Sequence, residues 1–189
     1  MKSYSAYFVR LSSMEEARSR FSTVEPIADS PWLMCDFRKD APPPDDEVLE
    51  GQKNLTQEKS RRLGEILFVY GDTSVDGFVY EHACDGTLLR KLVWFPLLDD
   101  DWTAGWLCAD GEPEPWETAL FREDSLARFL ENERQRLEDE GMEDAFPERE
   151  AEIREIWSAK QIMAGKTFPS CDGTVALLVE QSYGIQRSR

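Results

Sequence analysis

The chain has 189 residues, 38 of them Asp or Glu against 22 Lys or Arg, and its formal net charge is −16. With 41% hydrophobic residues, six Trp and ten Phe, it holds enough apolar material for a core, which excludes global disorder. Its apolar runs are far shorter than the roughly 20 residues of a membrane span, and its negative charge excludes nucleic acid and anionic membranes as expected partners. The first residues lack a signal-peptide pattern, so we expect a cytoplasmic protein.

The N-terminal part of the chain predicts short elements separated by irregular segments. Residues Tyr4–Leu11 alternate between two faces and predict a first strand. Ser13 and Glu16 have the spacing of a capping box, which predicts a short helix that ends near Phe21. The prolines that follow predict an exposed loop around residues 41–54. Two further short elements are expected on either side of that loop, a strand at Trp32–Phe37 and a helix at Leu55–Leu63.

A β-hairpin gives the strongest structural signal. Phe78–Cys84 and Thr87–Phe95 read as strands, and Asp85-Gly86 between them is a preferred pair for a two-residue type I′ turn. This turn predicts that Cys84 lies opposite Thr87 and Glu81 opposite Arg90. The same register places His82 opposite Leu89 and Phe78 opposite Val93. The run Glu65–Tyr70 predicts a third strand beside this hairpin.

The C-terminal half predicts a strand, two helices and a last strand. Ala104–Cys108 reads as a strand, and the two prolines of Gly111–Trp116 predict irregular structure. Apolar residues at helical spacing predict helices around Leu126–Leu137 and Ile153–Met163, and Val175–Glu180 reads as a final strand. We therefore expect a single α+β domain over residues 1–189, with an antiparallel sheet that meanders around the 78–95 hairpin and helices packed on one face.

Little in the sequence indicates chemistry. His82 is the only histidine, and the motifs of phosphate loops, serine hydrolases and zinc proteases are absent. The four cysteines are widely spaced, which predicts free thiols. We expect no catalytic residue, no metal and no cofactor. The alternative is a small enzyme or ligand-binding domain with its site near the sheet, around His82 and the 71–77 loop.

The acid is concentrated in one segment. Leu97–Glu155 holds 20 Asp and Glu but only 6 Lys and Arg. Part of it lies on the expected solvent faces of helices, and the rest follows an irregular stretch rich in Trp. Aromatic anchors inside an acidic rim are typical of protein-binding surfaces that attract a basic partner. The predicted partner-binding residues are Asp99, Asp100, Asp101, Trp102, Trp106, Glu112, Glu114 and Trp116.

We therefore expect a non-enzymatic binding protein that recognises a basic protein partner. Small acidic inhibitors and immunity proteins that neutralise basic nucleases or toxins are the class-level analogy. The other alternative is an acidic surface that serves only solubility. The sequence leaves the identity of a partner and the oligomeric state open.

Overall fold

The computed structural model describes residues 2–10, 14–96 and 104–186. Its centre is a seven-stranded sheet in the order β2-β3-β1-β4-β5-β6-β7, and every neighbouring pair is antiparallel. The strands are β1 (Ser3–Arg10), β2 (Val24–Pro26), β3 (Trp32–Lys39), β4 (Ile66–Asp72), β5 (Gly77–Cys84), β6 (Thr87–Pro96) and β7 (Ala104–Gly111). The predicted α+β fold is confirmed, because β4 to β7 form a meander around the expected hairpin.

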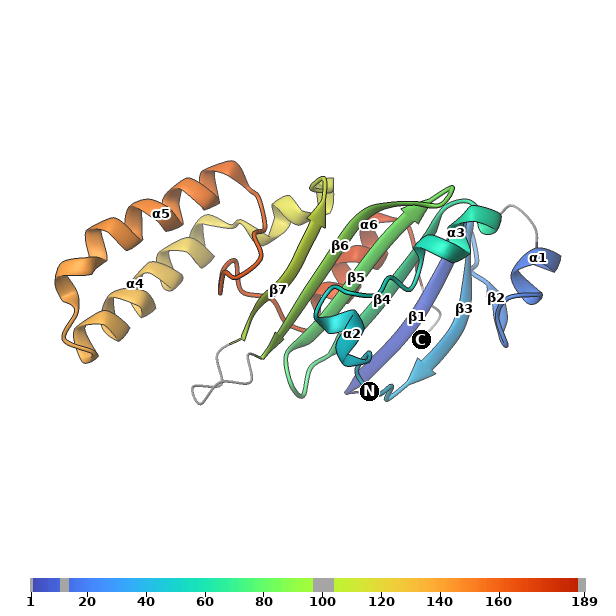
Figure 1. Ribbon diagram of the computed structural model, residues 1–189, viewed down its shortest axis with the longest axis horizontal. Coiled ribbons are helices and arrows are strands. Elements are labelled where there is room, and N and C mark those ends of the chain that lie inside the picture. Colours follow the sequence, from blue (N-terminus) through green and yellow to red (C-terminus); the bar gives the residue numbers. More distant parts are fainter. Residues whose placement is uncertain (1, 11–13, 97–103, 187–189) are drawn as a thin grey trace.

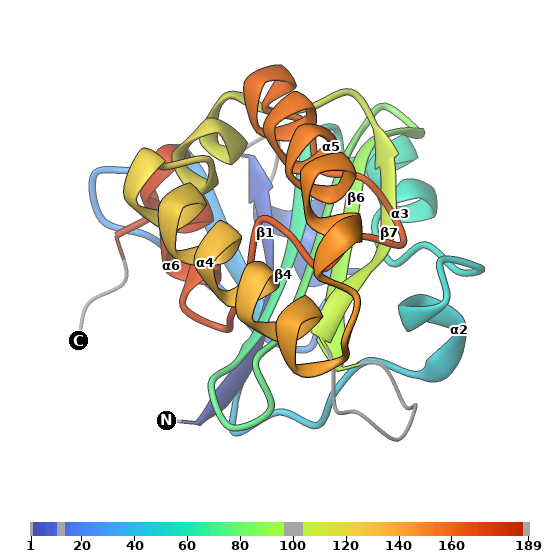
Figure 2. The same ribbon diagram turned by 90° about the vertical axis from the view of Figure 1, so that its left-hand side faces the viewer.

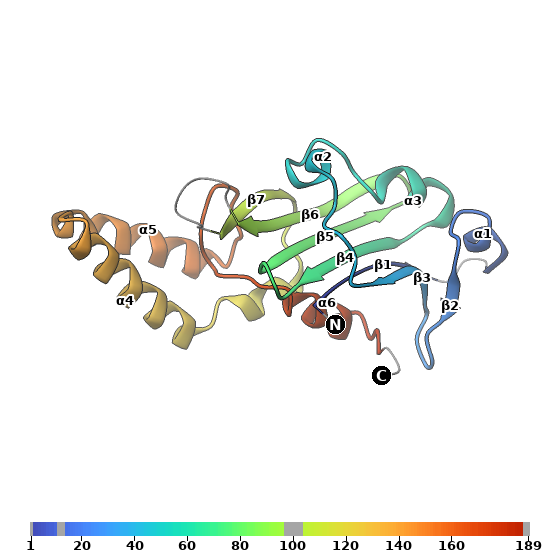
Figure 3. The same ribbon diagram turned by 90° about the horizontal axis from the view of Figure 1, so that it is seen from below.

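The helices lie on both faces of this sheet and beyond its edge. They are α1 (Met14–Arg18), α2 (Asp46–Leu49), α3 (Gln57–Leu63), α4 (Glu123–Asp139), α5 (Phe146–Ala159), α6 (Val175–Ser182) and the 3₁₀ turns η1 (Pro115–Leu120) and η2 (Glu143–Ala145). Figure 1 and Figure 3 show α2 and α3 on one face of the sheet and α6 on the other. The expectation that helices cover one face only is therefore corrected. The physical reason lies in β4, which is buried at every position, so that both of its faces need a cover.

The β5–β6 hairpin has the predicted turn and a shifted register. Asp85 and Gly86 both have positive φ, as a type I′ turn requires, and Cys84 lies opposite Thr87. Beyond the turn, a β-bulge at Leu89 adds one residue to β6. The predicted pairing of Glu81 with Arg90 is therefore wrong by one position. Glu81 lies opposite Lys91, His82 lies opposite Arg90, and Phe78 lies opposite Trp94.

The expected last strand is a helix. In α6 the buried residues Val175, Ala176 and Val179 share one helical face, whereas Leu177 is 47% exposed. The segment before α6 packs closely on β4, because a Cβ atom on Gly173 would lie 2.5 Å from the backbone of Asp72. The prediction of a strand at Val175–Glu180 is therefore wrong. Five consecutive apolar residues are too few to separate a strand from a buried helix by periodicity.

Two other boundaries differ from the predictions. The second long helix ends at Ala159, where Lys160 takes a left-handed conformation, so that Met163 lies outside it and is exposed. The segment predicted to be irregular contains the end of β7 and the start of η1 at Pro115. Proline suits the first turn of a helix, because its φ is fixed and its missing N–H is not needed there.

Candidate functional site

The predicted partner-binding residues fall into three kinds of place. Asp99, Asp100, Asp101 and Trp102 lie outside the described residues. Trp106 is 0% and Trp116 is 6% exposed, so both indole rings belong to the core on the α6 face of the sheet. Glu112 is exposed, and Glu114 is half-buried. The structure therefore brings Glu114 and Trp116 together, but it buries the indole rings of both Trp106 and Trp116. The partner-binding role of the whole set stays a prediction.

Glu114 is the centre of a hydrogen-bond network between distant segments. Its Oε2 accepts hydrogen bonds from the hydroxyls of Tyr80 and Tyr183, each at 2.6 Å, and from Nε1 of Trp116 at 2.9 Å. Its Oε1 lies 2.6 Å from Nδ1 of His82. These donors come from β5, from η1 and from the residue that ends α6. One carboxylate thus joins the sheet, η1 and the C-terminal helix.

The network shifts the pKa values of its members. Burial raises the pKa of Tyr80 well above its ordinary value, and the neighbouring Glu114 charge adds to this rise. Burial and the hydrogen bond to Glu114 raise the pKa of Tyr183 as well. Burial alone would raise the pKa of Glu114, but the hydrogen bonds from His82, Tyr183 and Tyr80 outweigh it and hold that pKa below 4.5. The stable state is therefore a carboxylate surrounded by neutral phenols.

His82 has the partner of a general base but not its access. A carboxylate on Nδ1 orients a histidine so that Nε2 is free to take a proton. The Nε2 atom of His82 is buried, lies 3.3 Å from Oε1 of Glu65, and forms no hydrogen bond with a described residue. The side chain as a whole is 8% exposed. These contacts favour a structural role for His82 over a catalytic one.

The 71–77 loop is not part of this network. It joins β4 to β5 at the end of the hairpin where Asp72 pairs with Gly77, whereas His82 lies near the other end of β5. Within the loop, the hydroxyl and amide of Ser74 both donate to Oδ1 of Asp72, at 2.6 and 2.7 Å. The hydroxyl of Thr73 donates to the carbonyl of Lys2. The loop is thus a turn stabilised by its own side chains.

Two buried ion pairs on β5 and β6 were not predicted. Arg90 binds Glu117 of η1 through two parallel hydrogen bonds of 2.8 and 2.7 Å, with side chains 1% and 0% exposed. On the opposite face, Nζ of Lys91 lies 3.3 Å from Glu81 Oε1, and both side chains are 0% exposed. The opposite charges of Glu81 and Arg90 in the predicted hairpin were the sequence signal for an ion pair. The bulge shifts the register, so that Glu81 pairs with Lys91 instead and Arg90 pairs with Glu117. Paired buried charges hold neighbouring segments in register and are costly to break.

Hollows and thiols near this region give no sign of a metal centre. Glu112 and Glu114 line a shallow groove of about 460 Å³ together with Lys160. The four cysteines are free thiols. Across residues 2–10, 14–96 and 104–186, no group of three or more His, Cys, Asp or Glu side chains is placed to hold a metal ion.

Helices α4 and α5 form an arm that extends past β7, away from the rest of the sheet (Figure 1). Figure 2 shows the two helices side by side. Glu133 joins them, since it accepts hydrogen bonds from Arg136 of α4 and from Arg149 of α5. At the base of the arm, the rings of Phe121 and Trp157 meet edge to face at 5.5 Å. These contacts join α4 to α5 and pack α5 against the segment that precedes α4.

The far end of the arm is a concentrated anionic surface. Residues 138–148, which we call the acidic tip, contain six carboxylates and no Lys or Arg. Among the described residues, four of these carboxylates have no ion-pair or hydrogen-bond partner. These four are Glu138, Glu143, Asp144 and Glu148. In the same segment Met142 is 51% exposed, and the guanidinium of Arg134 lies 4.7 Å from the centroid of the Phe146 ring.

No family model, curated protein or solved structure matches the chain. The described part of the chain contains no helix with the length and apolar character that crossing a membrane requires.

Proposed function

We propose that the chain is a binding protein that recognises a basic protein surface, and that the acidic tip is its contact surface. The observation that carries the proposal is the six-carboxylate tip at the end of the arm, with Met142 exposed among unpaired acids. Elsewhere on α4 and α5, five of the seven carboxylates form ion pairs, for example Glu133 with Arg149 and Glu150 with Arg154. Unpaired charge at the tip attracts a partner of opposite sign and steers its approach.

Met142 gives the tip a feature that charge alone does not provide. A methionine side chain is flexible and polarizable, and it fills irregular apolar pockets on a partner. An apolar anchor within a charged rim is the usual arrangement of an interface centre. The proposed partner therefore carries Lys or Arg around a small apolar depression.

The competing functions are less well supported. An enzymatic site at His82 lacks access, because Nε2 is buried and the Glu114 carboxylate is occupied by four neighbours. An acidic surface that serves only solubility predicts that position does not matter and that any four carboxylates are equivalent. The experiment below separates that alternative from the proposal.

The test is capture from lysate with three forms of the tagged chain at low and at high salt. The first form is the wild type, and the second removes the unpaired tip charges by Glu138→Gln, Glu143→Gln, Asp144→Asn and Glu148→Gln. The third is a control with the same change in net charge at exposed positions far from the arm, Glu15→Gln, Glu25→Gln, Asp29→Asn and Glu58→Gln. We expect one basic protein retained by the wild type and the control but lost from the tip variant, and lost from all three at high salt.

Equal retention by the tip variant and the control would overturn the proposal and leave solubility as the role of the acid. The substitution Met142→Gln adds a second criterion, because it leaves the net charge unchanged. We expect Met142→Gln to weaken retention of the same basic protein. Full retention by this variant would overturn the role of Met142 as an anchor.

A further inference from the structure

A hollow of about 360 Å³ lies on the sheet face that carries α2 and α3. Its floor consists of side chains from β1 and β4 that the strand register places side by side, Tyr7 opposite Phe68 and Ser5 opposite Tyr70. Its walls come from four other segments: the end of the α1 segment, β3, the proline run and α3. The wall residues include Arg20, Phe21, Arg38, Pro42, Pro43, Pro44 and Lys59.

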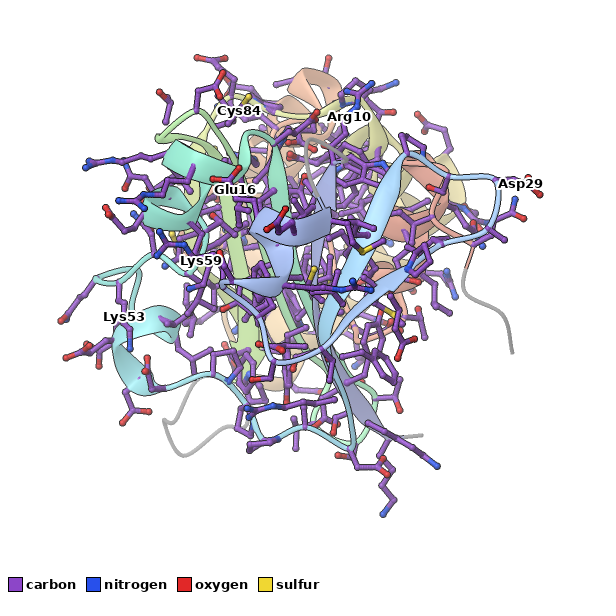
Figure 4. All side chains as sticks on the ribbon, turned by 90° about the vertical axis from the view of Figure 1, so that its right-hand side faces the viewer. Arg10, Glu16, Asp29, Lys53, Lys59 and Cys84 are labelled. Atoms are coloured by element: carbon purple, nitrogen blue, oxygen red, sulfur yellow. The ribbon has the colours of Figure 1, made fainter. Side chains whose placement is uncertain are left out.

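The floor of this hollow is aromatic. The ring of Tyr7 lies 4.9 Å from that of Phe68 and 5.1 Å from that of Phe21, measured between centroids. The Nζ atom of Lys59 lies 5.2 Å from the Tyr7 centroid. Figure 4 shows Lys59 on the α2–α3 side of the molecule, seen from the end of the sheet that carries α1. The rings of Phe68 and Phe21 are tilted by 53° and 43° to that of Tyr7, so a planar ligand ring can meet one of these rings face to face and another at its edge, with a cation at its border.

The charge of the hollow is opposite to that of the whole chain. Three cations line it, Arg20, Arg38 and Lys59, and the guanidiniums of both arginines have no ion-pair partner among the described residues. Two carboxylates line it as well, but both have other partners. Asp45 caps α2 and binds Nζ of Lys53 at 2.6 Å, and Asp36 accepts a hydrogen bond from the amide of Thr23. The Nζ atom of Lys59 donates a hydrogen bond of 3.1 Å to the carbonyl of Leu55. With three cations against two carboxylates, the lining carries one net positive charge, which favours an anion.

Two hydroxyls in the floor also lack partners. Neither Ser5 nor Tyr7 forms a side-chain hydrogen bond with the residues that the structure describes. Burial, followed by the charges of Glu81 and Asp36, raises the pKa of Tyr7 to about 12, so that its hydroxyl stays a donor at neutral pH. Each hydroxyl offers a hydrogen bond to a ligand that lies on the floor.

The proline run supplies a fixed wall. Its first residue, Ala41, is buried, and its carbonyl accepts a hydrogen bond of 2.8 Å from the hydroxyl of Ser3. Proline holds φ near one value, so the three prolines that follow keep the wall in place without regular structure. A preformed wall reduces the entropy that a ligand must overcome on binding. The run is therefore anchored at Ala41, while Pro42 and Pro43 stay exposed as expected for this loop.

We propose that this hollow binds a small organic anion, with a planar apolar ring on the floor of Tyr7 and Phe68 and an anionic group at Arg20, Arg38 and Lys59. The site is independent of the acidic tip, because it lies on another part of the chain and selects the opposite charge. Its size is at the small end of the range of ligand pockets, which suits a ligand of one or two rings.

The test titrates the full chain with three probes by calorimetry: 2-naphthyl phosphate, neutral 2-naphthol and inorganic phosphate. We expect saturable one-site binding of 2-naphthyl phosphate that is at least about tenfold tighter than binding of either fragment. Arg38→Gln and Lys59→Gln should each weaken it about tenfold. Lys39→Gln is the matched control, since Lys39 is exposed, follows Arg38 on β3 and does not line the hollow.

Four outcomes would overturn the proposal. Absence of saturable binding would show that the hollow is not a ligand site. Equal affinity for 2-naphthol would show that the cations do not contribute, and equal affinity for inorganic phosphate would show that the aromatic floor does not. If Lys39→Gln lowers the affinity for 2-naphthyl phosphate as much as Arg38→Gln does, the probe binds surface charge in general and not the hollow. Amide chemical-shift changes of the wild type give a readout that needs no variant, and they are expected at Ser5, Tyr7 and Phe68.

Discussion

The carboxylate of Glu114 lies 2.6 Å from the imidazole of His82, although 32 positions separate them in the sequence. The same carboxylate accepts a hydrogen bond from the hydroxyl of Tyr183, which lies 69 positions after Glu114 in the sequence. One side chain thus holds together β5, the start of η1 and the end of α6. The contacts of Glu114 make it the first position at which to test the fold.

Replacement of Glu114 by Gln should lower the free energy of unfolding by about 2–4 kcal/mol. The amide keeps the shape of the side chain but removes the charge that strengthens several hydrogen bonds, and it places an NH₂ group among donors. Urea denaturation followed by Trp fluorescence measures the change. Glu112→Gln is the control, because Glu112 is exposed two positions away, and it should leave the unfolding midpoint where it was.

The same network predicts how stability depends on pH. The pKa of Glu114 in the folded chain is below its ordinary value of 4.5, so its contribution is present above that value and is lost as the pH falls through the folded pKa. Stability of the wild type relative to Glu114→Gln should therefore shrink on acidification below pH 4.5. Unfolding curves at a series of pH values measure this difference, and a constant difference down to pH 2 contradicts the prediction.

The loss of folding stability at high pH comes from raised pKa values rather than a lowered one. The folded pKa values of Tyr80 and Tyr183 are raised above 10.0, so the unfolded chain loses these protons first as the pH rises. Stability should therefore fall above pH 10. Tyr183→Phe should show a shallower fall, because one of the tyrosines with a raised pKa is absent, and an unchanged slope would contradict this.

The buried pair of Glu81 and Lys91 should show strong coupling. Lys91→Met leaves the Glu81 carboxylate without its cation, although Glu81 keeps hydrogen bonds from the amides of Leu55 and Thr56. The single variant should lose about 3–5 kcal/mol of unfolding free energy. The double variant Glu81→Gln with Lys91→Met should lose less than the sum of the single losses. Additive losses would show that the two groups do not interact.

The C-terminal helix gives a test of element type. If α6 is a helix, Leu177→Gln changes an exposed position and should cost little, whereas Val179→Ala removes buried methyl groups and should cost about 1–3 kcal/mol. A strand would place residues 175, 177 and 179 on one face, and both variants would then be equally destabilised. Chemical denaturation of the two variants distinguishes these cases.

The sequence predicted the parts of the fold that local chemistry decides. The Asp85-Gly86 turn and the alternation of β1 appear where they were expected, because turn residues and period-two burial are local properties. The register beyond the turn was not predictable, since the bulge at Leu89 depends on β7. There Gly111 approaches so closely that a Cβ on it would lie 2.0 Å from the Leu89 carbonyl oxygen.

The candidate sites show the same limit. Glu114 and Trp116 were singled out as surface residues from composition, but their environment is set by Tyr80 and Tyr183, which lie far away in sequence. The acidic tip was assigned to solvent-facing helix charge. Only the arrangement of α4 and α5 shows that the tip projects beyond the sheet (Figure 1). The hollow of Tyr7 and Phe68 depends on the pairing of β1 with β4, which no local pattern specifies.

The central claim is that position, rather than total charge, makes the acidic tip a binding surface. The most direct measurement is the affinity of the purified basic partner for the wild type, the four-residue tip variant and the charge-matched control, between about 50 and 500 mM salt. We predict that the tip variant binds at least about tenfold more weakly at low salt and responds less to added salt, while the control stays close to the wild type. Equal weakening of the tip variant and the control would contradict the claim.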